Sequence, residues 1–218
     1  MSAVSLDLLD RATVRARARN IAVAAVFVAL AAGGLMGLFA GVAGFAGVAC
    51  VVGLPLVLLA WSEARKTYSL DGTQLSVREF GTRAVDLGQA EGLDVLVTNV
   101  RGMRTISLLA KGPPKGKAVN LALATYREIG AGQVGAGQVG GKELDVYPLR
   151  RLADALASTG DTRALVLSEL LVAQLKAEAR GDAGGDRPLY RIGQLAGGGR
   201  MAQRLPSEAV AKFVTALD

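Results

Sequence analysis

The chain has 218 residues, 51% of them hydrophobic, and its mean hydropathy of +0.35 is high for a soluble protein. It contains no histidine, which excludes a Ser-His-Asp triad, a histidine general base and any metal site with histidine ligands. Composition therefore indicates a protein with a membrane segment, for which we expect no cofactor, no metal and no catalysis. An enzyme that works without histidine, for example on lipid, is the least favoured alternative.

The apolar residues are concentrated in one long uncharged segment. Residues 21–61 carry no charge, and their polar content is little more than glycine, one cysteine and one proline. As one straight helix they would span about 60 Å, twice the ~30 Å hydrocarbon core of a bilayer. We therefore expect a two-helix transmembrane hairpin, with helices near 21–39 and 42–61 joined through the glycine-rich stretch "GLFAGVAGFAG".

Two other interpretations of this segment are less favoured. A cleaved signal peptide also has basic residues before an apolar run, but its apolar core is only about 7–15 residues long and a polar mature start follows it. A buried helical hairpin of a soluble protein is disfavoured by the length of the uncharged run. Cys50, the only cysteine, makes no intramolecular disulfide, and a packing role is favoured over a reactive thiol.

Basic residues flank the uncharged segment on both sides and set its expected orientation. Four arginines precede it, namely Arg11, Arg15, Arg17 and Arg19. Arg65 and Lys66 follow it, whereas the turn between the two expected helices carries no charge. The positive-inside rule therefore places both termini in the cytoplasm.

Residues 1–20 are expected to form a basic juxtamembrane segment. Its apolar side chains suit the membrane interface: Leu6, Leu8, Leu9 and Val14. Arg15, Arg17 and Arg19 are candidates for contact with anionic lipid, where each basic residue contributes about 1 kcal/mol. A topology signal with no lipid-binding role is the simpler interpretation.

Small residues recur at intervals of four within the uncharged segment. The glycines in these spacings are Gly33, Gly37, Gly41 and Gly53. Small residues let helix backbones approach closely, so we expect them to pack the helices of the hairpin together. Packing against another copy is the alternative. The segment holds no ionisable side chain apart from its cysteine thiol, which argues against a proton relay or an ion pathway.

Short strands with period-2 patterning follow the uncharged segment. Turn signals separate them, beginning with the Asp71-Gly72 pair. Six strands are expected within residues 66–126, and a seventh over "KELDVY", residues 142–147. Together they predict a small antiparallel sheet or barrel. The tandem repeat in residues 131–140 predicts a flexible loop, and it lacks the Lys-Ser/Thr pair of a phosphate-binding loop.

Amphipathic patterns predict three helices after the strands. "PLRRLADALASTG", residues 148–160, starts with proline and ends at glycine. "DTRALVLSELLVAQLKAEARG" predicts the second helix, with Asp161 or Thr162 as its N-cap. Apolar residues cover more than half of its circumference, so it must be buried against the sheet and its neighbouring helix or against another protein. After a glycine-rich linker, "PSEAVAKFVTALD" predicts a last helix capped by Ser207.

The order of these elements resembles that of the small bacterial membrane proteins that carry a bacterial pleckstrin-homology (PH) domain. The resemblance covers residues 20–159 and rests on element order and on the first hairpin, "YSLDGTQLSV". It implies an α+β protein of the bacterial cytoplasmic (inner) membrane. A cytoplasmic seven-stranded PH-like barrel with a closing helix would occupy residues 64–159, and a helical C-terminal extension residues 160–218.

Eukaryotic lipid-binding members of the wider PH-like fold carry a basic cluster, K-x(n)-K/R-x-R, on their first two strands. Lys66 and Arg78 match the first two places, but Phe80 stands where the last arginine belongs. The resemblance therefore does not predict specific phosphoinositide recognition.

Basic turns of the expected sheet are further candidates for contact with anionic lipid. Three lysines lie in one turn: Lys111, Lys115 and Lys117. Four of the 25 basic and two of the 19 acidic residues precede Ser62, which leaves a net charge of +4 over the remaining 157 residues. This balance favours an ordinary solvated surface and argues against nucleic-acid binding. Glu143 and Asp145 repeat one solvent face of a strand rather than form a catalytic pair.

These patterns predict a non-catalytic membrane-anchored interaction module that scaffolds or regulates a larger membrane complex as an accessory subunit. Its expected partners are membrane lipids and other membrane protein subunits. Peripheral sensing of anionic lipid by the PH-like domain is the alternative.

Overall fold

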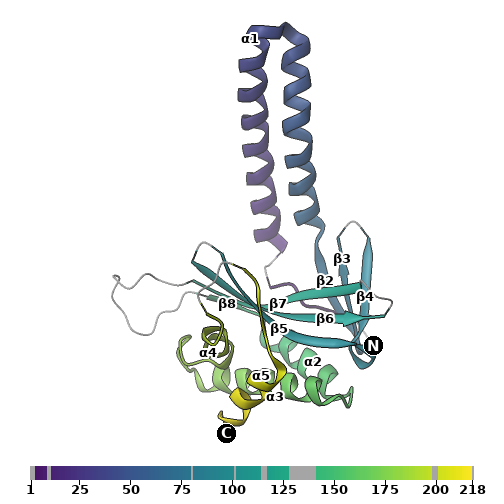
Figure 1. Ribbon diagram of the computed structural model, residues 1–218, viewed down its shortest axis with the longest axis vertical. Coiled ribbons are helices and arrows are strands. Elements are labelled where there is room, and N and C mark those ends of the chain that lie inside the picture. Colours follow the sequence, from purple (N-terminus) through teal and green to yellow (C-terminus); the bar gives the residue numbers. More distant parts are fainter. Residues whose placement is uncertain are drawn as a thin grey trace. The chain divides into compact units, whose positions relative to one another are not determined.

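In a computed structural model of the protein, the described residues are 3–8, 11–79, 81–100, 102–113, 117–127, 141–197 and 201–217. The chain divides into two compact units. The helical unit comprises Leu9–Thr67 and Arg78–Gly81. The sheet unit comprises Met1–Leu8, Tyr68–Val77 and Thr82–Asp218. The fold is α+β, as the sequence predicts, and it contains a long apolar N-terminal helix and antiparallel sheets (Figure 1).

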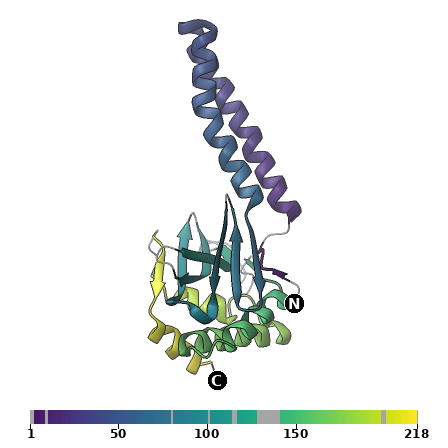
Figure 2. The same ribbon diagram turned by 90° about the vertical axis from the view of Figure 1, so that its right-hand side faces the viewer.

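The helical unit is built from α1, Arg11–Arg65, which is interrupted at Gly41. Gly41 has a φ of 65° and a ψ of −157°, backbone angles that glycine adopts without a steric cost. A Cβ built on Gly33 would lie 3.0 Å from the backbone oxygen of Phe45 and 3.2 Å from the Cβ of Ala49. The parts of α1 before and after Gly41 therefore lie against each other, as Figures 1 and 2 show.

The sheet unit contains a four-stranded and a five-stranded sheet. The first sheet has the order β1 (Val4–Ser5), β2 (Thr67–Asp71), β3 (Gln74–Arg78) and β4 (Thr82–Asp86). The second has the order β8 (Gly141–Glu143), β7 (Lys117–Arg127), β6 (Met103–Gly112), β5 (Gly92–Val100) and β9 (Gln203–Leu205). A short 3₁₀ helix, η1 (Leu87–Gln89), follows β4. Gly72, with a φ of 59°, lies in the turn between β2 and β3 that the Asp-Gly pair predicts.

The predicted seven-stranded barrel is wrong, because the described strands form two sheets that do not close on each other. The sequence pattern does not predict two of the strands. β1 has two residues and β9 has three, which are too few to show a period of two. The strand predicted over residues 142–147 ends at Glu143, since a helix already begins at Val146.

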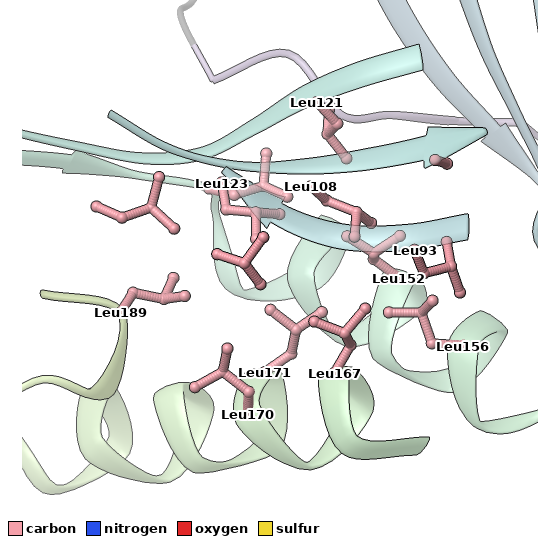
Figure 3. Packing of buried hydrophobic residues seen from close by; sticks show 14 of the residues in the cluster. Leu93, Leu108, Leu121, Leu123, Leu152, Leu156, Leu167, Leu170, Leu171 and Leu189 are labelled. Atoms are coloured by element: carbon pink, nitrogen blue, oxygen red, sulfur yellow. The ribbon is translucent and has the colours of Figure 1, made fainter. Parts of the chain in front are cut away.

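Four helices complete the sheet unit among the described residues: α2 (Val146–Ala157), α3 (Thr162–Arg180), α4 (Pro188–Gln194) and α5 (Ser207–Thr215). Figure 3 shows Leu108 and Leu123 of the five-stranded sheet above leucines of α2 and α3. Burying each such side chain contributes about 1.5–3 kcal/mol. Residues of α3, α4 and α5 belong to the same hydrophobic cluster as the strands. The described helices after residue 160 thus contribute side chains to this core.

The interfacial position predicted for Leu6 is wrong. Its side chain is fully buried in the hydrophobic cluster of the sheet unit. Strand β1 pairs with β2 through Val4 and Leu70, and the backbone N–H of Leu6 donates to the oxygen of Tyr68. Leu6, together with the partly buried Leu8, therefore packs in the core of the sheet unit.

The ends of two helices differ in how well the sequence predicts them. Asp161 is the N-cap of α3, as expected, and its carboxylate accepts a hydrogen bond of 2.9 Å from the backbone N–H of Arg163. The cap predicted for α5 is wrong: Ser207 is its first helical residue and Pro206 precedes it. The carbonyl of Pro206 accepts from the backbone N–H groups of Ala209 and Val210, so the helix begins without a side-chain cap.

Candidate interaction surfaces

The helical unit exposes a large apolar surface. The stretch Ala12–Leu58 is long and apolar enough to cross a membrane, and 17% of its most apolar window is buried. Phe39 and Val42, on either side of the break in α1, are each 86% exposed. Soluble proteins rarely expose contiguous apolar surface of this extent. Such a surface suits contact with hydrocarbon or with other membrane helices.

The four glycines predicted to pack the membrane helices have two different roles. Gly33 and Gly37 face Phe45, and an added Cβ on Gly53 would lie 3.1 Å from the Cβ of Ala29. Gly41 has nothing within 4 Å of an added Cβ. Its role is therefore to allow the break in α1 and not to pack the two parts of the helix together. Small residues let the two parts of α1 approach at three of the four positions.

Other small residues of α1 face outward. Gly34 and Gly47 have no atom within 4 Å of an added Cβ, which leaves open space beside them. Cys50 is also exposed in this unit, and its packing role stays a prediction. These positions are open to another helix.

The basic residues predicted to contact lipid fall in different units. Arg15 and Arg19 are exposed on α1, and Arg17 also lies in this helix. Lys111 and Lys117 are exposed at the neighbouring ends of β6 and β7. Lys115 and the repeat in residues 131–140 lie outside the described residues. The described candidate residues thus belong partly to the helical unit and partly to the sheet unit.

One edge of the five-stranded sheet is covered by the end of the chain itself. Strand β9 pairs antiparallel with the middle of β5, at Val95–Val97. Leu205 of β9 is 6% exposed and belongs to the core cluster. Arg204 pairs with Asp94, whose side chain is 9% exposed, at 2.5 Å. Backbone pairing, one apolar anchor and one ion pair thus hold β9 on this edge.

A cavity of about 180 Å³ lies beside this edge, between β5, α3, β9 and α5. Its lining is mainly apolar and includes Leu93, Val95, Val166, Leu167, Leu205 and Val210. The carboxylate of Asp94 also lines it, and its Oδ2 atom is buried without a hydrogen bond although it contacts Arg204. Such a lining suits an apolar side chain or a small apolar ligand.

A second polar cluster lies at the opposite edge of the same sheet, around Glu143. One carboxylate oxygen accepts a hydrogen bond of 2.7 Å from the Tyr126 hydroxyl. The other accepts from Gln174 at 2.7 Å and from Arg187 at 2.6 Å. Gln174 is fully buried, and its side-chain oxygen accepts from the backbone N–H of Leu189. The cluster ties β7, β8, α3 and α4 together.

The electrostatics of this cluster favour a structural role. Burial, followed by the charge of Glu143 and its hydrogen bond, raises the pKa of the Tyr126 hydroxyl far above its usual range. Burial by itself lowers the pKa of Arg187, but the hydrogen bond to Glu143 and its charge raise it overall. Tyr126 thus stays neutral and Arg187 charged. The prediction that Glu143 repeats a solvent face is wrong, since its side chain is only 12% exposed.

The described residues contain no group of three or more histidine, cysteine, aspartate or glutamate side chains that could hold a metal ion. Comparisons with protein-family models, curated proteins and solved structures found no match. The resemblance to membrane proteins with a PH domain therefore stays a prediction.

Proposed function

We propose that the protein is a non-catalytic membrane-anchored interaction module, an accessory subunit of a larger membrane complex. In this proposal α1 crosses the bilayer twice and reverses at Gly41, and both termini lie in the cytoplasm. The observation that carries the membrane anchor is the exposed apolar surface of α1, exemplified by Phe39 and Val42 at 86%. Each part of α1 within residues 21–61 is about 20 residues, or about 30 Å, long, which matches the hydrocarbon core.

The pairing of strands on either side of α1 supports an even number of crossings. Strand β1 precedes α1, β2 follows it, and the two are hydrogen-bonded in one sheet. The backbone N–H of Tyr68 also donates to the Asp7 carboxylate at 2.8 Å. A chain that leaves this sheet through α1 must therefore return to the same side.

Residues at the end of α1 suit the membrane interface. The guanidinium of Arg65 lies 4.0 Å from the ring centre of Trp61, a cation–π contact. Tryptophan is enriched at the headgroup level, and basic residues are enriched on the cytoplasmic side. The four arginines before the apolar segment carry the same charge. Both flanks favour the orientation predicted from the sequence.

The sheet unit supports interaction rather than catalysis. Its interior is aliphatic (Figure 3), and the buried titratable groups around Glu143 bind one another. Leu165 and Val172 of α3, two turns apart, are 41% and 39% exposed. Exposed apolar residues on one helix face are a candidate contact with another protein. Sensing of anionic lipid by Lys111 and Lys117 stays a prediction from the sequence.

Purification in a mild detergent from cells that express the tagged protein at native level tests the proposal. We expect at least one other membrane protein to co-purify, identified by mass spectrometry. If partners dock on the outward small residues of α1, Gly47→Leu should lower their recovery several-fold, because added bulk keeps helices apart. Val51→Leu is the matched control, because Val51 is 75% exposed and already has a bulky side chain. The partners should co-purify with this variant as fully as with the wild type. A solitary monomer would refute the accessory-subunit proposal.

A further inference from the structure

The cavity between β5, α3, β9 and α5 is larger than the gaps that close packing leaves. Its volume is about 180 Å³. Packed protein elements leave few voids larger than a water molecule, because each void deprives its lining of dispersion contacts. An apolar cavity of about 150 Å³ in a protein stays dry and binds benzene or xenon. This cavity is therefore large enough to hold a small ligand.

The buried part of the lining is aliphatic. Its buried side chains come from both strands and both helices, and they are Leu93, Val95, Leu167, Leu205 and Val210. Two further aliphatic side chains, Val166 and Ala211, are half-buried. None of these side chains contains a nitrogen or an oxygen atom. An apolar ligand body would therefore gain dispersion contacts here without leaving a side-chain donor or acceptor unpaired.

The exposed part of the lining is polar. It includes Thr162 and Arg163 in the first turn of α3, and Ser207 and Glu208 in the first turn of α5. A serine or threonine hydroxyl can both donate and accept a hydrogen bond. A ligand whose apolar body fills the buried part thus has polar partners for one end at the exposed part.

The charged residues of the lining do not favour a charged ligand. The carboxylate of Asp94 already lies 2.5 Å from the guanidinium of Arg204. The guanidinium of Arg163 lies 3.1 Å from the carboxylate of Asp161. Glu208 is exposed, and an ion pair at an exposed position contributes little. A carboxylate or an ammonium group would therefore lose its hydration in this cavity with little compensation.

We propose that this cavity binds a small uncharged aliphatic molecule that carries one hydroxyl or carbonyl group. Its aliphatic body lies among Leu93, Leu167 and Val210, and its polar group lies toward Thr162 and Ser207. Bound ligand stabilises the packing of β9 and α5 on β5 and α3, because all four elements line the cavity. The inference goes beyond the proposed interaction function and does not rest on it, since every lining residue belongs to the sheet unit.

The test titrates 1-hexanol into the full-length protein in detergent micelles, with ¹³C-labelled leucine and valine methyl groups observed by NMR. We expect saturable shifts of the methyl signals of Leu93, Leu167 and Val210, with a dissociation constant of about 1 mM or below. Hexanol also dissolves in micelles. The methyl groups of Leu38 and Val42, which are 82% and 86% exposed on α1, report this partition as shifts that do not saturate.

Chain length and charge of the ligand test its chemical class. Affinity should rise about fourfold for each methylene from 1-butanol to 1-hexanol, because each one is buried among aliphatic side chains. Hexanoate and hexylammonium should bind several-fold more weakly than 1-hexanol, because either ion must give up its hydration. Equal or tighter binding of one of these ions would overturn the assignment of an uncharged ligand.

A substitution that fills the cavity tests its location. Ala211→Leu should abolish saturable binding of 1-hexanol and raise the thermal unfolding midpoint of the ligand-free protein, because the new side chain occupies the empty space. Ala209→Leu is the matched control. It adds the same side chain to α5 at another half-buried alanine, which lies outside the lining, and should leave the affinity for 1-hexanol unchanged.

The wild-type titration decides the proposal even if Ala211→Leu does not fold. Methyl shifts of Leu93, Leu167 and Val210 that grow in proportion to those of Leu38 would show partition into micelles alone and would overturn the proposal. Saturable binding that a folded Ala211→Leu protein retains would place the ligand elsewhere and would also overturn it. These results are separate from the accessory-subunit proposal, which co-purification tests.

Discussion

Glu143 is a carboxylate with little access to water that nevertheless has donors for both of its oxygens. A buried charge is costly unless hydrogen bonds and an opposite charge compensate it. Tyr126, Gln174 and Arg187 provide that compensation, from β7, from α3 and from the residue before α4. Because the donors come from distant parts of the chain, their bonds fix how α3 and α4 lie on the sheet.

The hydroxyl of Tyr126 makes the stability of the sheet unit depend on pH in the alkaline range. Its pKa is raised above the ordinary value of 10.0, first by burial and then by the charge of Glu143. The folded protein therefore holds this proton more tightly than the unfolded chain. Its contribution to stability is complete below about pH 10 and falls above it, by up to about 1.4 kcal/mol per pH unit.

We expect Tyr126→Phe to remove this alkaline loss of stability. The measurement is the thermal unfolding midpoint of the detergent-solubilised protein between about pH 8 and about pH 11. As the pH rises over this range, the unfolding midpoint of the wild type should fall further than that of the variant. Tyr147→Phe is the matched control, because Tyr147 is 62% exposed, and should keep the wild-type slope. An unchanged slope in Tyr126→Phe would contradict the assigned role of this proton.

The sequence predicts some residues well and misses others for a physical reason. The N-cap at Asp161 depends on a local hydrogen bond to a residue two positions further along the chain, so a sequence pattern predicts it. The partners of Glu143 lie 17, 31 and 44 residues away, and no local pattern reports contacts at such separations. The spacing of Glu143 and Asp145 therefore suggests a solvent face where the fold builds a buried cluster.

At the scale of elements, close packing of α1 depends on the positions where its two parts meet. A side chain on Gly33 would collide with the backbone oxygen of Phe45, whereas one on Gly34 would meet nothing within 4 Å. A backbone atom cannot move aside as a flexible side chain can. Overpacking of this kind typically costs about 1–3 kcal/mol.

We expect Gly33→Leu to separate the two parts of α1 and Gly34→Leu to leave them in contact. Disulfide formation between cysteines at Ala29 and Gly53, positions whose Cβ atoms would lie 3.1 Å apart, reports the contact. The background is Cys50→Ser, which removes the only native cysteine. Gly33→Leu should slow the cross-link several-fold under mild oxidation. Equal rates in both variants would argue against packing at Gly33.

Elements with many residues of one pattern are predicted well, and short ones are not. The strands β5, β6 and β7 have nine to eleven residues each, and their alternation is clear in the sequence. β1 and β9 owe their existence to partner strands, β2 and β5, rather than to their own composition. Each of them adds an edge strand to its sheet.

At the scale of the whole molecule, the chain contributes to the sheet unit both before and after α1. Residues 4–5 pair with residues 69–70, so the apolar segment begins and ends at one sheet. This long-range pairing cannot be read from the sequence. For the proposed membrane anchor it is compatible with the even number of crossings that the basic flanks predict. Charge and strand pairing thus both support the proposed topology.

We expect cysteines placed at Ala3 and Lys142, both exposed, to be labelled together and from the same side. In a Cys50→Ser background, a membrane-impermeant maleimide should leave both unlabelled in intact cells and label both after permeabilisation. Val42→Cys, next to the break in α1, is the opposite control and should react in intact cells. Labelling of Lys142→Cys in intact cells would show that the sheet unit lies outside the cytoplasm, which is the opposite of the expected orientation. Labelling of Ala3→Cys and Lys142→Cys from opposite sides would rule out the paired strands, because β1 and β2 can meet only on one side of a bilayer.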